Sequence, residues 1–225
     1  QSWSVIAGIG SAEQKKTALD SAYNLLCNGE NKLIRLFDPP FTSSDGVGYI
    51  GDYPRFVREN GGQYTQAAVW YVWALFQNGQ TERANELLKW LNPANRCKTE
   101  SDAEDYCVEP YVSAADVYGG ELAGKGGWTW YTGSAAWLYK CLITQYAGIT
   151  VRGDVVSFCP RLPKETKELN VNFLFGSENI KVKIINSSNG GDWRVRIGEV
   201  IYNTSSLRLT KGLSGKNIAV IRLLK

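Results

Sequence analysis

The segment from residue 57 to residue 66, VRENGGQYTQ, places a carboxylate, several amides and a glycine pair where a loop enters an apolar helix. Its polar side chains can donate and accept hydrogen bonds, and glycine lets a backbone approach a ligand closely. This polar density predicts a sugar-facing loop, with Glu59 and Gln63 as candidate substrate contacts. The alternative is an ordinary helix cap, in which Glu59 stabilises the positive end of the helix.

A second group of carboxylates and aromatic rings begins at Glu109-Pro110-Tyr111 and continues to Asp116 and Tyr118. Carboxylates hold sugar hydroxyls by accepting hydrogen bonds, and aromatic faces stack on pyranose rings. The pattern makes Glu109 a candidate substrate contact. The alternative is a polar loop that proline holds in place, with no ligand.

The third candidate is the segment GKGGWTWYTGS at residues 124–134, a glycine-rich, aromatic loop that ends in Thr-Gly-Ser before an apolar periodic stretch. Free amides and hydroxyls at the start of a helix suit an oxyanion such as phosphate, so Thr132 and Gly133 are candidate anion contacts. The spacing matches neither a Walker A loop nor a dinucleotide fingerprint. The alternative is a simple Thr or Ser cap, with Trp128 in the core or in the wall of a sugar site.

Composition excludes several kinds of chemistry and partner. The chain has no histidine and five dispersed cysteines, so it offers neither Ser-His-Asp nor Cys-His catalysis, nor a typical zinc site. We therefore expect no metal and no cofactor. The 25 basic and 22 acidic residues are spread along the chain, which argues against nucleic acid as a partner. We expect a soluble, cytoplasmic protein, because no apolar run reaches the roughly 18 residues of a membrane span.

The hydrophobic period divides the 225 residues near position 148. A helical period and end signals predict helices over about 11–29, 63–77, 81–91 and 134–148, with Thr81 as the cap of the third. Alternation and turn residues then predict strands. The expected domains are a mainly α domain, 1–148, and a small antiparallel β-sheet or sandwich, 149–225. The predicted strands are 149–152, 155–159, 171–175, 180–185, 193–197 and 218–223.

Four blocks together resemble, in order and spacing, the C-terminal part of glycoside hydrolase family 94. They are VRENGGQYTQAAVWYVWAL, LLKWLNPANR, VEPYVSAADVY and GGWTWYTGSAAWLYK. The resemblance runs from Gln1 to about Pro160 and is strongest to the phosphorylase-like domain of cyclic β-1,2-glucan synthases. It implies that residues 1–148 are the last helices of an (α/α)6 barrel.

Enzymes of this family split a β-glycosidic bond with inorganic phosphate, and an aspartate protonates the glycosidic oxygen. The resemblance implies that Glu59 contacts sugar, that Glu109 lies near the substrate, and that Thr132 and Gly133 contact phosphate. From the residue pattern, we expect Trp128 to be a further substrate contact. Gln66 departs from the family pattern, which usually has a phosphate-binding histidine there. Glutamine can donate a hydrogen bond but carries no positive charge, so we expect weaker phosphate binding or a changed acceptor.

The resemblance also implies that the aspartate motif lies upstream of residue 1, because no block of this chain matches it. The chain opens at Gln1 without methionine and runs at once into apolar residues, which suggests a fragment with an incomplete barrel. We expect apolar helix faces that meet the missing N-terminal part or self-associate. The chain alone should then be inactive.

Two other functions stay open. One is a non-catalytic carbohydrate-binding module, in which Trp128, Trp130 and Glu59 hold a glycan without phosphate chemistry. The other is a structural half-domain whose loops act only with the missing part. The sequence leaves the glycosidic linkage of the glucan open, and the parent could also be the cytoplasmic part of a membrane-bound enzyme.

Overall fold

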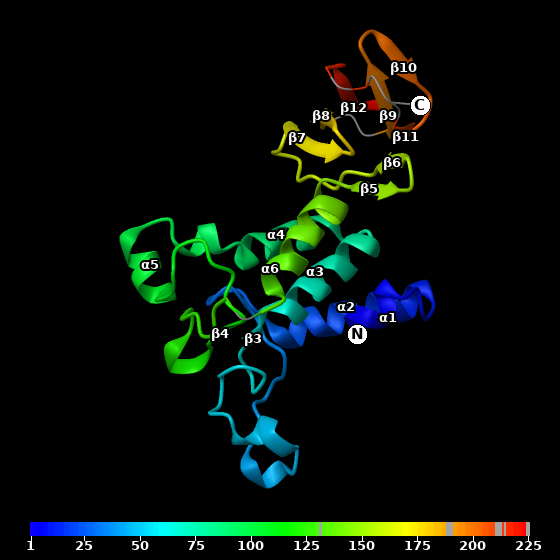
Figure 1. The fold of residues 1–225 in the computed structure, drawn as a ribbon. Helices are drawn as coiled ribbons and strands as arrows, with labels where there is room; N and C mark the ends of the chain where they lie inside the picture. Colours follow the sequence, from blue (N-terminus) through cyan, green and yellow to red (C-terminus); the bar gives the residue numbers. More distant parts are fainter. Residues whose placement is uncertain (131, 188–190, 210–212, 214, 224–225) are drawn as a thin grey trace. The chain divides into compact units, whose positions relative to one another are not determined.

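A computed structural model describes residues 1–130, 132–187, 191–209, 213 and 215–223 (Figure 1). The chain divides into two compact units, Gln1–Cys141 and Leu142–Lys225. The first is helical and the second consists of sheets, as the change of hydrophobic period predicts. Among the described residues, none of the helices is both long and apolar enough to cross a membrane.

The first unit contains helices, short 3-10 turns and two small strand pairs. Its α-helices are α1 Ser2–Ile6, α2 Ala12–Leu26, α3 Thr65–Gln77, α4 Thr81–Leu91, α5 Glu100–Tyr106 and α6 Ser134–Cys141. Its 3-10 helices are η1 Ser43–Asp45, η2 Gly48–Asp52, η3 Pro93–Arg96 and η4 Gly120–Leu122. Its strands are β1 Cys27–Asn28, β2 Leu33–Ile34, β3 Gln63–Tyr64 and β4 Asp116–Val117.

Helix α2 begins as its sequence predicts. The Ser11 hydroxyl accepts from the Gln14 amide at 3.2 Å, and the Gln14 side chain accepts from the Ser11 amide at 2.8 Å. This capping box satisfies two backbone donors that the first helical turn leaves free. The helix ends at Leu26, before the predicted Gly29, because Cys27 and Asn28 pair with Ile34 and Leu33 in an antiparallel ladder.

Helix α3 is the central helix of this unit and packs against α1, α4 and α6 (Figure 1). Its apolar positions are buried on several sides, and Val69, Val72, Ala74 and Leu75 have no exposed surface. The neighbouring helices predicted over 63–77 and 81–91 are present and pack together as an αα-hairpin of α3 and α4. The cap predicted for α4 is wrong, because Thr81 is already helical and Gln80 occupies the cap position without a side-chain hydrogen bond. The (α/α)6 barrel stays a prediction.

The second unit begins with the π-helix η5, Leu142–Tyr146, and continues as strands. One sheet has the order β11-β6-β5 and the other β10-β9-β12-β8-β7. Among the described residues, every strand pairing is antiparallel except that of β12 with β8, which is parallel, so the predicted antiparallel arrangement is wrong for this pair. The strands are β5 Ile149–Arg152, β6 Val155–Phe158, β7 Glu168–Phe175, β8 Glu178–Ile185, β9 Asp192–Ile197, β10 Val200–Tyr202, β11 Ser206–Arg208 and β12 Ile218–Leu223.

The units divide at Leu142 in the structure, whereas the hydrophobic period changes near 148. The reason is the π-turn after α6, whose Ile143 and Tyr146 pack on the core of the sheets. That core contains Val156, Phe158 and Ile184 among other apolar residues. The end of the last helical segment therefore belongs to the β unit by packing, although its period is helical.

Candidate functional site

Three segments that are distant in sequence are joined by backbone hydrogen bonds. Strands β3 and β4 pair Gln63 with Val117 and Tyr64 with Asp116. The Ala115 carbonyl accepts from the amide of Thr65, at 2.9 Å, and the Ala115 amide donates to the Trp128 carbonyl at 2.6 Å. The segment around β4 therefore lies between the start of α3 and the glycine-rich loop, and it brings the three candidate regions together.

The loop before α3 is held by Asn60, which has no exposed surface. Its side chain accepts from the Phe41 amide at 2.7 Å and donates to the carbonyls of Phe41 and Tyr53 at 3.1 and 2.9 Å. The glycine pair packs against the chain itself. A Cβ at position 61 would lie 2.5 Å from Pro40, and one at position 62 would lie 2.8 Å from the Arg58 carbonyl. The glycines thus shape the loop instead of opening space for a ligand.

Glu59 lies beside Arg58 in this loop. The Arg58 Nε atom is 3.5 Å from the Glu59 Oε2 atom, and both atoms are buried without a hydrogen-bond partner within the described residues. The Arg58 guanidinium lies 5.2 Å from the centre of the Trp128 ring. Trp128 itself is 53% exposed. A half-buried ion pair beneath an open indole face offers polar groups and a stacking surface to one ligand.

Asp116 belongs to the same group as Glu59 and Trp128 and is buried, with 1% of its surface exposed. Its Oδ1 atom accepts from the Trp128 amide at 2.9 Å, while Oδ2 is buried and has no hydrogen-bond partner in the described part of the chain. Burial raises the pKa of this carboxyl. A Cβ at position 127 would lie 2.7 Å from both carboxylate oxygens, so only glycine fits there. Asp116 fixes the backbone that carries Trp128.

Glu109 is exposed and pairs with a neighbouring tryptophan. Its Oε1 atom accepts from the Trp130 indole nitrogen at 2.8 Å. This hydrogen bond holds the pKa of Glu109 below its usual value. The carboxylate and the 78% exposed Trp130 ring stand together, as a carboxylate beside an aromatic face. Substrate contact by Glu109 stays a prediction.

The predicted anion contacts meet at the start of α6. The Ser134 amide donates to the Thr132 hydroxyl at 3.0 Å, and the buried Ser134 hydroxyl donates to the Ser113 carbonyl at 3.1 Å. A Cβ at position 133 would lie 2.7 Å from the Gln66 Oε1 atom, so the Gln66 side chain lies directly against Gly133. Gln66, Thr132 and Gly133 therefore form one cluster at a helix N-terminus, where the amide dipoles favour an anion.

Gln63 is buried, with 1% of its surface exposed. Its Oε1 atom accepts from the Ile34 amide at 3.1 Å, and its Nε2 atom donates to the Thr65 hydroxyl at 3.4 Å. The side chain thus joins β2 to the start of α3. These bonds give Gln63 a structural role, and its contact with substrate stays a prediction.

Residues 1–148 match the family model described as the glycosyl hydrolase 94 superfamily, catalytic domain. The chain belongs to glycosyl hydrolase family 94. It is 43% identical over 194 residues to the cyclic beta-(1,2)-glucan synthase NdvB of Rhizobium meliloti (strain 1021), covering 85% of this chain and 7% of that protein. The predicted resemblance to this family is confirmed.

Two further relatives of this family 94 chain are named as phosphorylases. The cellobionic acid phosphorylase of Neurospora crassa is 27% identical over 192 residues, covering 82% of this chain and 24% of that protein. The N,N'-diacetylchitobiose phosphorylase of Vibrio furnissii is 26% identical over 162 residues, covering 71% of this chain and 20% of that protein. This chain spans less than a quarter of the length of each of these relatives.

Within this family 94 chain, the structure brings Glu59 together with Trp128, and Gln66 together with Thr132 and Gly133. Sequence reasoning missed Arg58 as a member of the first group. Its position before a candidate glutamate was the available clue, since a cation and a carboxylate can share a ligand. The sequence places Asp116 only within the Glu109 block, and its hydrogen bond with the Trp128 amide depends on the tertiary structure.

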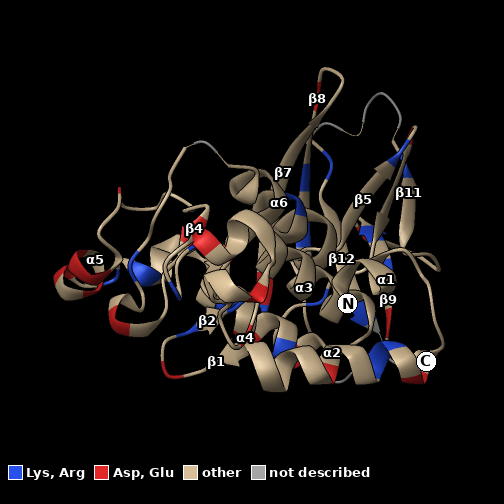
Figure 2. Ribbon diagram, turned by 90° about the horizontal axis from the view of Figure 1, so that it is seen from below, with Lys and Arg blue, Asp and Glu red and all other residues tan. Residues whose placement is uncertain are grey.

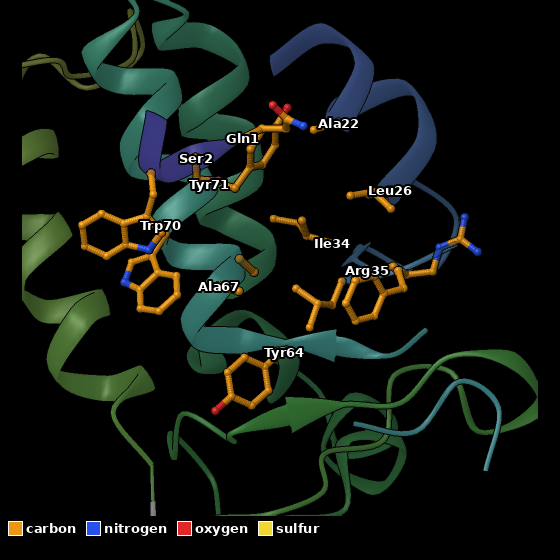
Figure 3. A pocket seen from close by; sticks show the side chains of 14 residues that line it. Gln1, Ser2, Ala22, Leu26, Ile34, Arg35, Tyr64, Ala67, Trp70 and Tyr71 are labelled. Atoms are coloured by element: carbon orange, nitrogen blue, oxygen red, sulfur yellow. The ribbon is translucent and has the colours of Figure 1, made fainter. Parts of the chain in front are cut away.

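An apolar pocket of 470 Å³ lies between α1, α2 and α3 of the family 94 domain (Figure 3). Trp70 and Tyr71 of α3 face it from one side, and Ala22 and Leu26 of α2 from another. Trp3 packs edge-on against Trp70, with ring centres 5.1 Å apart, and remains 48% exposed. Helix α1 and its surroundings therefore present apolar surface.

Proposed function

We propose that this chain supplies the sugar and phosphate contacts of an inverting glycoside phosphorylase that acts on β-linked glucans. The main support is that the segment Ser113–Asp116 connects two groups of candidate residues. One is Glu59 with Trp128, and the other is Gln66 with Thr132 and Gly133. The Asp116 end of the segment bonds the Trp128 amide, and its Ser113 end bonds Ser134 at the start of α6. A sugar held at Glu59 and Trp128 and an anion held at Gly133 would then share one face of the helical unit.

The chemistry of such an enzyme needs one protein carboxylate. The acid protonates the leaving glycosidic oxygen while phosphate attacks the anomeric carbon from the opposite face, which yields a sugar 1-phosphate with inverted configuration. Phosphate replaces the activated water, so an anion site replaces a general base. Inorganic phosphate is then the co-substrate and no cofactor takes part. In this proposal the general acid lies outside residues 1–225 and the chain alone is inactive.

The amides and hydroxyl at α6 would position the phosphate nucleophile. Gln66 donates through its side-chain amide but adds no charge, and the cluster of Gln66, Thr132 and Gly133 contains no cation. Phosphate binding would therefore rest on neutral donors and the helix dipole. We therefore expect the site to bind phosphate weakly, so that its occupancy depends on the phosphate concentration of the surrounding solution.

The apolar surface around α1 supports a further part of the proposal, which concerns partners. Single exposed apolar residues are common, but Trp3, which lines the pocket and is 48% exposed, and the 66% exposed Ile9 lie on one short stretch of chain. Such a concentration suits burial against another element. We propose that upstream helices of the same family 94 domain cover it, and that isolated chains self-associate there. The assembled protein would work in the cytoplasm.

The direct test is release of glucose 1-phosphate from a β-1,2-gluco-oligosaccharide in phosphate buffer. The chain alone would be compared with the chain mixed with a separately produced upstream segment of its parent. Activity only in the mixture would support the proposal. Activity of the chain alone would refute the claim that the acid lies elsewhere, and no activity in either sample would favour a different substrate or a binding module.

The second candidate is a non-catalytic carbohydrate-binding module. The observation that favours it is glutamine at position 66, where the family usually has histidine. Titration of the parent protein with the same oligosaccharide, with and without phosphate, separates the two functions. A phosphorylase should bind sugar and phosphate interdependently, whereas a binding module should hold the sugar equally well at every phosphate concentration.

A further inference from the structure

Charge is divided unevenly between the two compact units. Residues 142–225 contain 13 Lys and Arg against 6 Asp and Glu, a net charge of +7, and residues 1–141 contain 12 against 16, a net charge of −4. Together these give the 25 basic and 22 acidic residues of the chain, whose net charge of +3 conceals the difference. Figure 2 shows acidic residues gathered on α5 and basic residues recurring along strands of the β unit. Such asymmetry is typical of a chain in which one part meets an anionic partner.

A groove of 610 Å³ lies on the five-stranded sheet of the β unit. Ala219 of the central strand β12 lies at its floor, in register with Lys183 of β8 on one side and Arg196 of β9 on the other. The side chain of Ala219 is a short methyl group, whereas the neighbouring side chains of Lys183 and Arg196 are long. These two side chains therefore form the sides of the groove. The opposite face is apolar, since Val182 and Val220 belong to the buried core.

The groove carries an excess of positive charge. Lys181 and Lys216 are exposed and Arg196 is half-buried, and none of these three cations has an ion-pair partner within the described residues. Glu199 is the one acidic residue among the described residues that line the groove. The fourth cation, Lys183, pairs with Glu168 at 2.7 Å. Three cations are therefore available to a ligand.

The other polar groups of the groove are the side-chain amides of Asn170, Asn172 and Asn217. Amides donate to and accept from hydroxyl groups, and Lys and Arg bind oxyanions. No aromatic ring is among the described residues that line the groove, and single-stranded nucleic acids depend on such rings for stacking. Cations and amides together suit a hydroxylated ligand that also carries negative charge.

We propose that this groove is a second binding site, for a carbohydrate that carries phosphate or carboxylate groups. Neighbouring strands lie about 4.8 Å apart, so the polar side chains from β7 to β9 extend over roughly 14 Å. This length fits an oligosaccharide with more than one charged group better than a single small ion. The site lies in the β unit and does not depend on the phosphorylase chemistry proposed for the helical unit.

The experiment is a calorimetric titration of the full chain at low salt with three oligosaccharides of equal length. One carries phosphate groups, one is an oligogalacturonate with carboxylates, and one is neutral. Binding of either charged probe, with the neutral probe at least roughly tenfold weaker, is the expected result, and the probe that binds tighter identifies the anionic group. Equal binding of the neutral probe, or no binding of any probe, would overturn the proposal.

Two double variants distinguish binding by the groove residues from a general effect of the net charge of the chain. Lys181→Gln with Arg196→Gln should weaken binding of the charged probe by roughly tenfold or more. Arg152→Gln with Lys167→Gln removes the same charge outside the groove and should change affinity less than about threefold. Equal losses in both pairs would show that only net charge matters, against the proposal.

Two further measurements complete the test. Lys181→Arg with Arg196→Lys should restore binding, and circular dichroism should show that every variant is folded. Loss of binding in this charge-retaining pair, with the fold intact, would count against oxyanion contacts at these positions. Competition with duplex DNA and with vesicles of phosphatidylglycerol should leave carbohydrate binding in place, and tighter binding of either competitor would overturn the choice of ligand.

Discussion

At the scale of single residues, Asp116 combines two features that rarely occur together, full burial and an unpaired carboxylate oxygen. Burial raises its pKa above the ordinary value of 3.8, so the folded state holds the proton more tightly than the unfolded state. The stability that this proton contributes is complete below the ordinary pKa and is lost as pH rises through the folded pKa. At neutral pH, the ionised carboxylate of Asp116 therefore lowers the free energy of unfolding.

Asp116→Asn tests this account. Asparagine keeps an oxygen that can accept from the Trp128 amide and removes the charge, so the free energy of unfolding at pH 7 should stay equal or rise. The decline of stability as pH rises above the ordinary pKa of 3.8 should become shallower than in the wild type. Urea unfolding across this range measures both effects. Asp116→Ala is the matched comparison and should lose about 1–3 kcal/mol, because the Trp128 amide loses its acceptor.

A second prediction at this scale concerns Gly133. Alanine there places a Cβ against the Gln66 side chain, which is flexible and can turn away. We expect Gly133→Ala to change unfolding free energy by less than about 1 kcal/mol but to weaken phosphate binding by the parent protein roughly three- to tenfold. If the effect runs through Gln66, adding Gly133→Ala to Gln66→Ala should cause no further loss. An additive loss would show that Gly133 acts independently.

At the scale of elements, the turn from η5 into β5 depends on Gly148. Its φ is +66°, and a Cβ there would lie 2.1 Å from the Cys159 carbonyl carbon and oxygen. The Cys159 amide donates to the Gly148 carbonyl at 2.7 Å, beside the paired ends of β5 and β6. The Cys159 backbone therefore cannot move away from an added Cβ. Glycine is required here by contact as well as by conformation.

Gly148→Ala should therefore destabilise the protein by about 3 kcal/mol or more in urea unfolding. Gly153 gives a matched control, since its φ is +58° and a Cβ at this position would have no atom of the described residues within 4 Å. Gly153→Ala should cost only about 1 kcal/mol, the strain of a left-handed conformation. Equal costs for the two variants would mean that the close contact with Cys159 contributes nothing.

At the scale of the whole molecule, the exposed apolar residues near α1 and α2 bear on association. Ile9 and Leu25 are 66% and 64% exposed. We expect the isolated chain to self-associate at micromolar concentration, and Ile9→Ser with Leu25→Ser to shift it toward monomer in sedimentation velocity. Unfolding free energy should change by less than about 0.5 kcal/mol, since neither side chain is buried. Leu174→Ser, at a 74% exposed position of the β unit, should leave association unchanged.

At the same scale, part of the architecture can be predicted from the sequence. The capping box at Ser11, the buried period of α3 and the alternation in β5, β6, β8 and β9 are local patterns, and the structure has each of them. The parallel pairing of β12 with β8 and the short strands β10 and β11 were not predicted. Pairing partners lie far apart in the chain, and no local period records which strand will lie beside which.

By itself, the sequence determined the helical and β parts, the family, and the candidate residues Glu59, Trp128, Gln66, Thr132 and Gly133, because residue types and spacing carry that information. The tertiary structure decided which candidates meet. It placed Gln63 in a structural bond, joined Asp116 to Trp128, and set Gln66 against Gly133. It also gathered Lys181, Arg196 and Lys216 on one face. These contacts arise from strand pairing and loop packing between distant segments, and only the folded chain fixes those distances.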